Sequence, residues 1–379
     1  MRTIDYSGKK VNYFPLSLAS GKAFCNRRNE LKRIHYNLKN KNATLLISPR
    51  RYGKTSLALQ AFESIQWPYA HIDLYKALSE EDIAHFILNG IGQLLGKIES
   101  TPQKLIKVAS DFFTGLQLKF AVEKYGLSVE LSQKDKRPVD LILAALERLD
   151  AHVLKRKKQA ILFLDEFQVL AEVVNNNRIE AAIREAGQKT KAVCYVFSGS
   201  NRHLIESMFN DKKRPFYHLC DQLIVKRMHR SHYIPYLTHA AQERWSRTLS
   251  ESGMEVIFEV TELHPYYLNK LCSLIWQKEQ SPNAQDVYEI WHQHVNENKS
   301  SVEREFSLLR LNQRKLLLQL ALNQEIKMPF SKKYALQWSM SSTSIHRAMA
   351  SLIEKDYVLI DEEGNYKILD PLLKAVLSE

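Results

Sequence analysis

The chain has 379 residues, enough for two or three domains that fold without disulfides or metals. Its 45% hydrophobic and 25% charged residues are ordinary for a globular protein and exclude a disordered or fibrous one. No apolar run approaches the roughly 18 to 20 residues of a membrane span, and the first residues contain no apolar stretch of the kind expected in a signal peptide. We therefore expect a cytoplasmic protein with no membrane partner. The four cysteines form no close pair and are expected to be reduced core thiols: Cys25, Cys194, Cys220 and Cys272.

Most of the net charge of +12 lies near the N-terminus. Residues 1–60 contain thirteen Lys and Arg against two Asp and Glu, whereas residues 61–300 are neutral and residues 301–379 have a net charge of +1. A basic region of this kind attracts polyanions such as nucleic acid, nucleotide phosphate or an acidic protein face. The alternative is a solvated surface whose charge is balanced by acidic neighbours in the fold.

Five apolar runs of strand length are spread over the first 225 residues. They lie at Thr44–Ser48, Tyr69–Leu74, Ile161–Asp165, Ala192–Ser198 and Gln222–Val225. The runs are nearly continuous rather than alternating, which is typical of strands buried on both faces of a parallel sheet. Helical periodicity follows the first and the second run, so we predict an α/β fold with a parallel sheet flanked by helices.

Three further patterns divide the chain into domains. An interval near residues 98–138 interrupts the alternation and is expected to form an inserted helical hairpin or lid. From about Ser231 to Lys299 the periodicity is helical without a strand pattern. We therefore expect an α/β domain over 1–230, a small helical domain over 231–300 and a third domain over 301–379.

The last eighty residues follow the plan of a winged helix. The expected elements are a helix at Glu303–Leu322, a segment at Phe330–Trp338, a turn at Ser339–Ser341, a helix at Ser342–Lys355 and two short strands around Asp361–Asn365. The polar side chains of the second long helix suit contacts to phosphates and base edges: Ser342, Thr343, His346 and Arg347. The net charge is low for a DNA-binding module, and winged helices also dock proteins.

A phosphate-binding pattern follows the first predicted strand. Gly53, Lys54 and Thr55 lie between this strand and a helix. In such a loop, backbone N–H groups surround the β-phosphate, the lysine reaches the β- and γ-phosphates, and the threonine hydroxyl binds Mg²⁺. The full pattern has a glycine where this chain has Ser48. The residues predicted to bind the nucleotide here are Pro49, Arg50, Arg51, Tyr52, Gly53, Lys54, Thr55 and Ser56.

Two carboxylates end the strand at Ile161–Asp165. Asp165 can hold the Mg²⁺ ion, and Glu166 can orient and deprotonate an attacking water. Two carboxylates could also begin an ordinary loop, but together with Lys54 and Thr55 they occur in the right order and in the right elements. The sequence thus predicts a site for ATP and Mg²⁺, with Lys54 and Glu166 as the catalytic residues.

Polar residues also end the next predicted strand. Ser198 and Ser200 are placed to sense the γ-phosphate beside the two carboxylates. Because serine, glycine and asparagine favour turns, the segment Ser198–Asn201 is equally consistent with a simple strand-to-helix turn.

These motifs resemble those of the bacterial and archaeal P-loop ATPases of the STAND/AAA-like class, often called archaeal-type ATPases. The matching segments cover nearly the whole chain: Phe24–Leu31, Ser48–Ser56, Asp165–Gln168, Ser198–Ser200, His264–Leu268 and Asp370–Leu372. The resemblance implies an ATPase core, a helical lid and a winged helix that work together as a nucleotide-controlled switch.

The resemblance also implies roles for single residues. Asn26 and Arg27 would approach the adenine and ribose, and Pro265 would lie where the helical domain closes on the nucleotide. Leu263 stands where a glycine is common before the His-Pro pair, and His218 stands where an arginine is frequent. The candidates for an arginine finger are Arg202, Arg214, Arg227 and Arg230, among which the sequence does not choose.

The main functional hypothesis is a Mg²⁺-dependent, ATP-hydrolysing switch that couples its nucleotide state to a partner through the helical and winged-helix domains. The alternatives are an ATP-regulated DNA-binding protein and a non-catalytic scaffold that binds ATP. Candidate partners are DNA or a protein, bound by the winged helix or the basic N-terminal region, and a second copy of the chain in a homo-oligomer.

Overall fold

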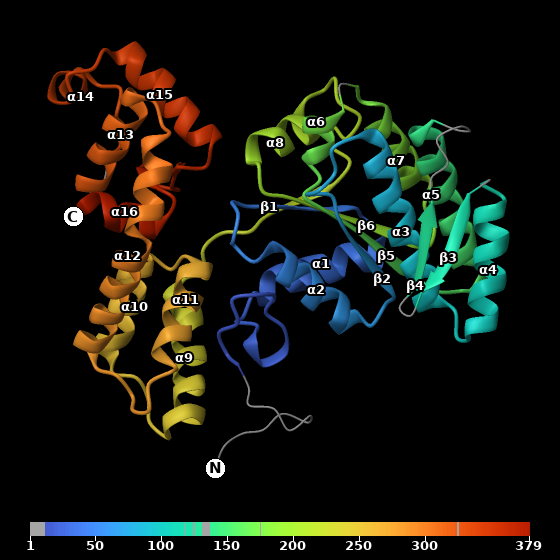
Figure 1. Cartoon of the computed structure of the whole chain (residues 1–379), viewed down its shortest axis with the longest axis horizontal. Coiled ribbons are helices and arrows are strands. Elements are labelled where there is room, and N and C mark those ends of the chain that lie inside the picture. Colours follow the sequence, from blue (N-terminus) through green and yellow to red (C-terminus); the bar gives the residue numbers. More distant parts are fainter. Residues whose placement is uncertain (1–11, 117, 124–125, 131–136, 175, 324–325) are drawn as a thin grey trace. The chain divides into compact units, whose positions relative to one another are not determined.

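The computed structural model describes residues 12–116, 118–123, 126–130, 137–174, 176–323 and 326–379 (Figure 1). The first eleven residues, which belong to the predicted basic region, lie outside this part of the chain. Two compact units are formed. The α/β unit consists of Arg27–Arg50 and Lys54–Val225, and the helical unit consists of the described residues up to Asn26, Arg51–Gly53 and Lys226–Glu379. Among the described residues, no helix has both the length and the apolar character needed to span a membrane.

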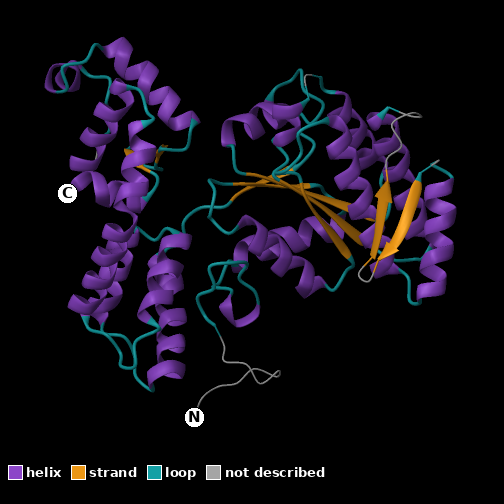
Figure 2. Cartoon of the chain, viewed as in Figure 1, coloured by secondary structure: helices purple, strands orange, loops and turns teal. Residues whose placement is uncertain are grey.

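The α/β unit is built on a parallel five-stranded sheet (Figure 2). Its order is β2 (Tyr69–Asp73), β5 (Ala160–Asp165), β6 (Val193–Gly199), β1 (Thr44–Ile47) and β7 (Asp221–Ile224). Every residue of β1, β5 and β6 is buried, whereas the edge strands β2 and β7 are partly exposed. All five predicted strands are confirmed, because continuous apolar runs suit strands covered on both faces.

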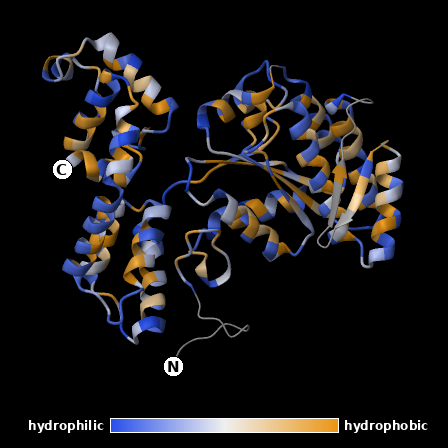
Figure 3. Cartoon of the chain, in the orientation of Figure 1, coloured by the Kyte–Doolittle hydropathy of each residue, from blue (hydrophilic) through white to orange (hydrophobic). Residues whose placement is uncertain are grey.

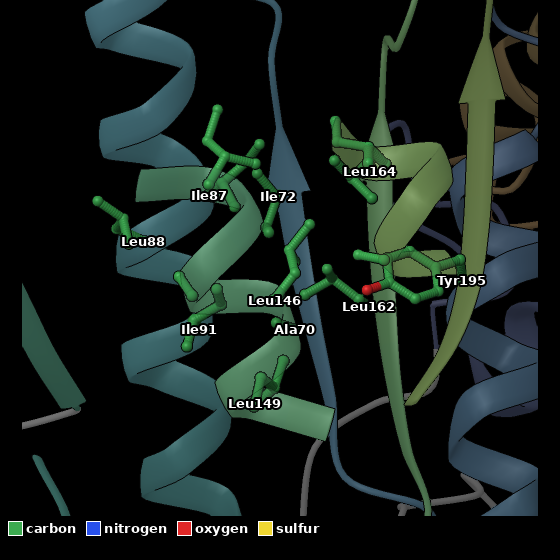
Figure 4. Close-up of a cluster of buried hydrophobic side chains, with 14 of the residues drawn as sticks. Ala70, Ile72, Ile87, Leu88, Ile91, Leu146, Leu149, Leu162, Leu164 and Tyr195 are labelled. Carbon is green, nitrogen blue, oxygen red and sulfur yellow. The ribbon is translucent and has the colours of Figure 1, made fainter. Parts of the chain in front are cut away.

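Helices cover this sheet. They are α1 (Arg28–Asn40), α2 (Lys54–Ile65), α3 (Glu80–Ile98), α5 (Pro138–Lys155), α6 (Val169–Val173), α7 (Arg178–Lys189) and α8 (Arg202–Asn210). Figure 4 shows Ile87 and Ile91 of α3 and Leu146 of α5 beside Ile72 of β2 and Leu162 of β5. The apolar faces of α3 and α5 thus pack on one face of the sheet and hold its strands in place.

The predicted helical hairpin near residues 98–138 is wrong. A helix, α4 (Pro102–Thr114), is followed by an antiparallel pair of strands, β3 (Lys119–Glu123) and β4 (Gly126–Glu130). Both strand sequences, KFAVE and GLSVE, alternate polar or small residues with larger apolar ones. This period of two favours a hairpin over a second helix.

The helical unit begins with a 3₁₀ turn, η1 (Gly21–Ala23), and continues with α9 (Arg230–Trp245), α10 (Glu251–Thr261), α11 (Pro265–Ile275) and α12 (Ala284–Ser307). The predicted helical character of residues 231–299 is confirmed. In Figure 3 the helices carry both hydrophobic and hydrophilic residues, as expected of helices with one face on a core.

A capping box starts the long helix α12. The Asn283 side-chain oxygen accepts a hydrogen bond from the backbone N–H of Asp286 at 3.0 Å. The Asp286 carboxylate in turn accepts one from the backbone N–H of Asn283 at 2.9 Å. Asn283→Ala leaves the Asp286 amide without this acceptor, so we expect the free energy of unfolding to fall by about 1 kcal/mol. Denaturant unfolding of the variant tests this, and Asn296→Ala, on the exposed middle of α12, is the control.

The winged helix completes the helical unit. It contains α13 (Leu311–Leu322), α14 (Lys332–Gln337), α15 (Ser342–Glu354), β8 (Val358–Ile360), β9 (Tyr366–Ile368) and α16 (Pro371–Ser378). The expected single helix Glu303–Leu322 is in fact the end of α12 and the whole of α13, which Leu308–Arg310 separate. Ile326 pairs with Tyr366 and extends the hairpin of β8 and β9.

All four cysteines are free thiols. Cys194 and Cys272 are buried, while Cys25 and Cys220 are partly exposed. Burial raises the pKa of Cys194 to about 11, so this thiol stays protonated at neutral pH. The predicted core positions are confirmed for Cys194 and Cys272, and the reduced state stays a prediction.

Candidate functional site

The loop after β1 leads directly into α2. Lys54 is the first residue of α2 and is 6% exposed. Its ammonium donates hydrogen bonds to the carbonyl oxygens of Ser48 at 2.8 Å and Pro49 at 3.1 Å. The charge therefore lies against the loop backbone at the start of a helix, where an anion is favoured.

Ser48 occupies the position where the phosphate-loop pattern has a glycine. Its φ lies outside the left-handed region, so a side chain costs no strain there. The Ser48 hydroxyl accepts a hydrogen bond from Lys54 at 3.2 Å and donates one to the Pro49 carbonyl at 3.0 Å. Gly53, in contrast, has a φ of +84°, which other residues rarely adopt. The departure at Ser48 is thus compatible with the loop, whereas Gly53 is required by its backbone.

Asp165 ends β5 and is surrounded by donors. Oδ2 accepts a hydrogen bond from the Thr55 hydroxyl at 2.8 Å, and Oδ1 accepts one from the Ser198 hydroxyl. His71 Nε2 lies 3.1 Å from Oδ2. Burial alone would raise the pKa of Asp165, but the hydrogen bonds from His71, Ser198 and Thr55 outweigh it and lower this pKa. Asp165 is therefore a carboxylate, beside a threonine 110 residues away in sequence.

Glu166 follows directly in a left-handed conformation, with a φ of +52°. Its Oε2 accepts hydrogen bonds from Gln168 Nε2 and from the Ser200 hydroxyl, each at 2.6 Å. The two predicted carboxylates thus have different partners: Asp165 accepts a hydrogen bond from Thr55, and Glu166 accepts hydrogen bonds from Gln168 and Ser200.

The strand order explains why both serines meet the carboxylates. β6 lies between β1 and β5, so its end lies between the loop after β1 and the residues after β5. Ser198 contacts Asp165, Ser200 contacts Glu166, and Arg50 Nε lies 3.5 Å from the Ser200 hydroxyl. Asn201 caps α8 by accepting a hydrogen bond from the Leu204 amide. The segment is therefore both a strand-to-helix turn and part of the candidate site.

His71 joins the candidate site, although no motif in the sequence pointed to it. It lies on β2, pairs in register with Phe163 of β5, and stacks on the Phe163 ring at a centroid distance of 4.9 Å. Its ring nitrogen reaches Asp165 because β2 and β5 are neighbours. The only signal in the sequence is a histidine inside an apolar strand.

Asn26 and Arg27 precede α1. Both have positive φ, at +51° and +66°. Arg27 is buried, and its guanidinium lies 3.1 Å from the Glu30 carboxylate. The roles of both residues at the adenine and ribose stay predictions.

In the helical unit, the tip of the phosphate loop contacts the start of α11. The Arg51 guanidinium lies 4.5 Å from the centroid of the Tyr266 ring. The Tyr52 hydroxyl accepts a hydrogen bond from Arg227 at 3.0 Å, and its ring meets His264 edge-on at 4.9 Å. Pro265, the predicted nucleotide contact, is the first residue of α11. The two predicted elements, loop tip and His-Pro turn, therefore meet.

Leu263, which stands where a glycine is common before the His-Pro pair, adopts an unusual backbone conformation. Leu263 has a φ of +58°, in the region that a glycine adopts without strain. A glycine would suit this turn for that reason. His218, the second departure, also has a positive φ, at +52°.

Two arginine-finger candidates have partners in their own unit. Arg227 donates hydrogen bonds to the Glu262 carboxylate at 3.1 Å and to the Leu369 carbonyl at 2.7 Å. Arg214 lies 2.8 Å from the buried Glu180. Arg230, a third candidate, pairs in the same way with Glu255 of α10 at 3.0 Å, so these contacts do not choose among the candidates.

The predicted DNA-contacting residues of α15 are exposed, and the turn between β8 and β9 carries carboxylates. Ser342, Thr343, His346 and Arg347 are all exposed, and His346 stacks on Phe330 at 3.7 Å. The turn between β8 and β9 contains the three consecutive carboxylates of Asp361–Glu363. Carboxylates at the tip of the wing repel phosphates, so the charge of this hairpin does not favour DNA.

Comparisons with known proteins support the fold. Residues 302–379 match a family model described as a probable winged helix domain. No curated protein matches the chain. The Walker-type ATPase PABY2304 of Pyrococcus abyssi is similar in structure, with a TM-score of 0.70, 17% identity, and coverage of 97% of this chain and 100% of that one. The Aeropyrum pernix ORC2 protein, in its ADPNP–ADP complexes, gives a TM-score of 0.59, 13% identity, and coverage of 93% and 92%.

At these identities the likeness shows the fold alone. The membership in the STAND class, the domain boundaries and the roles of the site residues stay predictions. The predicted fold class is confirmed: the chain has the parallel sheet and flanking helices of the P-loop ATPase fold, followed by a C-terminal winged helix.

Proposed function

We infer that this chain is a Mg²⁺-dependent ATPase that works as a nucleotide-controlled switch. The observation that carries the proposal is the 2.8 Å hydrogen bond between Thr55 and Asp165, with Glu166 as the next residue. A hydroxyl, a buried carboxylate and a second carboxylate are the oxygen groups that a P-loop site uses. They converge from two segments 110 residues apart.

The donor set fits Mg²⁺. The Thr55 hydroxyl and the Asp165 carboxylate are oxygen donors in contact, and Asp165 is charged. These two residues would hold the ion, which supplies positive charge to the phosphate oxygens when it is bound. The predicted metal ligands thus have the chemistry that the ion requires.

The remaining residues act on ATP. The loop amides and Lys54 bind the phosphates, and the Lys54 ammonium exchanges its contacts with the Ser48 and Pro49 carbonyls for phosphate oxygens. Glu166 accepts a proton from a water molecule as the water oxygen bonds to the γ-phosphorus. The bond from this phosphorus to the bridging oxygen breaks, and its electron pair leaves with ADP. Ser198 and Ser200 lie beside the carboxylates and sense the γ-phosphate.

A hydrogen-bond network supports the switch in the helical unit. Arg227 is partly buried and donates hydrogen bonds to Tyr52 of the loop tip, Glu262 before α11 and Leu369 before α16. Glu262 also pairs with Lys374 of α16 at 2.6 Å. A displacement of Tyr52 by nucleotide therefore acts on both the α10–α11 turn and the winged helix. The carboxylates of Asp361–Glu363 at the wing do not favour DNA as the partner of the switch.

Lys54→Met tests ATP binding. The change removes the ammonium while it keeps an unbranched side chain, and a charge-assisted hydrogen bond contributes about 1.5 to 3 kcal/mol. We expect the dissociation constant for MgATP to rise roughly 10- to 100-fold in a calorimetric titration. Lys41→Met, on an exposed lysine of the same unit, is the control. Equal MgATP affinity of Lys54→Met and the native protein would contradict the proposed site.

A phosphate-release assay separates the switch from the scaffold. The proposal expects the native protein to bind MgATP and to release phosphate under the same conditions. Binding with no release at any protein concentration would support the non-catalytic scaffold instead.

A further inference from the structure

Gln168 is a buried amide beside the predicted general base. It precedes α6 and is only 2% exposed. Its Nε2 donates a hydrogen bond of 2.6 Å to Glu166 Oε2. Burying a polar side chain is costly unless its hydrogen bonds are made, and Gln168 makes one through Nε2, whereas its buried Oε1 accepts none from the described residues.

The neighbouring strand leaves room for the Gln168 amide. A Cβ atom on Gly199 would lie 2.8 Å from Gln168 Oε1 and 2.2 Å from Cγ1 of Ile205. Any side chain at position 199 would therefore displace the amide. Because Gly199, between Ser198 and Ser200 in the sequence, has no side chain, the end of β6 leaves space for the Gln168 amide.

A second donor fixes the same carboxylate oxygen. The Ser200 hydroxyl donates to Glu166 Oε2 at 2.6 Å. The backbone is also anchored, because the Phe167 amide donates to the Ser198 carbonyl at 2.8 Å. Two donors on Oε2 define the plane of the carboxylate and leave Oε1 as the oxygen that can accept a proton from water.

We propose that Gln168 is a positioning residue that, together with Ser200, orients the Glu166 carboxylate for its reaction with water. The inference rests on the proposed ATPase function and adds a specific role to the amide. Gln168 transfers no proton itself. Its effect is on the orientation of Glu166, and a misplaced catalytic group lowers the rate of the chemical step more than it affects binding.

Gln168→Met tests the role, since methionine has a similar length and shape but no N–H donor. We expect kcat to fall roughly 10- to 100-fold, with KM for ATP within about twofold of the native value. Leu170→Met, a volume-conserving change two residues along the same buried segment, is the matched control and should keep the native kcat. Native kcat in Gln168→Met would overturn the inference.

A second measurement needs neither ATP nor Mg²⁺. Thermal unfolding of the nucleotide-free protein is measured for Glu166→Ala, Gln168→Met and the double variant. Residues in direct contact give non-additive changes, so we expect the shift in Tm of the double variant to differ from the sum of the single shifts. Additive shifts would show that the contact is not made and would overturn the inference.

Glu166→Gln separates the two proposals. An inactive Glu166→Gln with a fully active Gln168→Met contradicts only the positioning role. An active Glu166→Gln contradicts the proposed ATPase mechanism itself, whatever Gln168→Met shows.

Discussion

Glu166→Gln is expected to bind MgATP and to lose its turnover. The amide is nearly the same size as the carboxylate and can still accept the hydrogen bonds from Gln168 and Ser200 through its oxygen. It cannot accept a proton from water, and a positioned general base contributes about 100- to 10,000-fold to a rate. We therefore expect steady-state phosphate release to fall by at least about 100-fold.

The binding measurement makes this result specific. Because Thr55, Asp165 and Lys54 are unchanged, the affinity of Glu166→Gln for MgATP should stay within about threefold of the native value. Glu172→Gln, a change to a nearby carboxylate on α6, is the control for the loss of one negative charge and should keep most of the turnover. Turnover in Glu166→Gln equal to that of the native protein would remove Glu166 from the mechanism.

The second large effect is a loss of stability in acid that depends on His264. This side chain is 3% exposed and precedes α11. Burial, together with the positive charge of Arg227, lowers the pKa of His264 to about 3. In the unfolded chain, a histidine has a pKa of about 6.5.

These two pKa values determine whether acid raises or lowers the free energy of unfolding. Below pH 6.5 the unfolded chain binds a proton at His264 that the folded chain does not bind, so acid favours unfolding. The free energy of unfolding should fall by up to about 1.4 kcal/mol per pH unit between pH 6.5 and 3, or about 4 kcal/mol in all. Above pH 6.5 His264 is neutral in both states and adds no pH dependence.

Denaturant unfolding at pH 7.5, 6, 5 and 4 measures this slope. His264→Gln removes the titrating group, so the variant should lose less stability than the native protein as the pH falls. His239→Gln, on the exposed side of α9, should keep the native slope. Parallel pH profiles for the native protein and His264→Gln would show that His264 does not cause the loss.

The sequence predicted the groups of the candidate site that lie in local patterns. Lys54 and Thr55 follow a buried strand and open a helix, and the backbone N–H groups at that point are unsatisfied by rule. Asp165 and Glu166 end a second continuous apolar strand. Each pattern lies within a short stretch of the chain, so it can be recognised without knowledge of the fold.

Errors arose where a local pattern was weak. The segment after α3 was expected to form a helical hairpin or lid, but the alternation in β3 and β4 has a period of two over just five residues each. The break between α12 and α13 was missed because Leu308 and Leu309 continue an apolar helical pattern across it. In both places a few residues decide the element, and propensity over so short a window is easily overridden by packing.

By itself, the sequence determined the parallel sheet, the glycine-dependent phosphate loop, the two carboxylates and the winged-helix plan. Only the tertiary structure decided which distant side chains meet them: His71 at Asp165 and Ser200 at Glu166. The physical reason is the strand order. β2 lies next to β5, and β6 lies between β5 and β1, so contacts at the edge of the sheet join residues far apart in the chain. No local pattern in the sequence specifies which strands become neighbours.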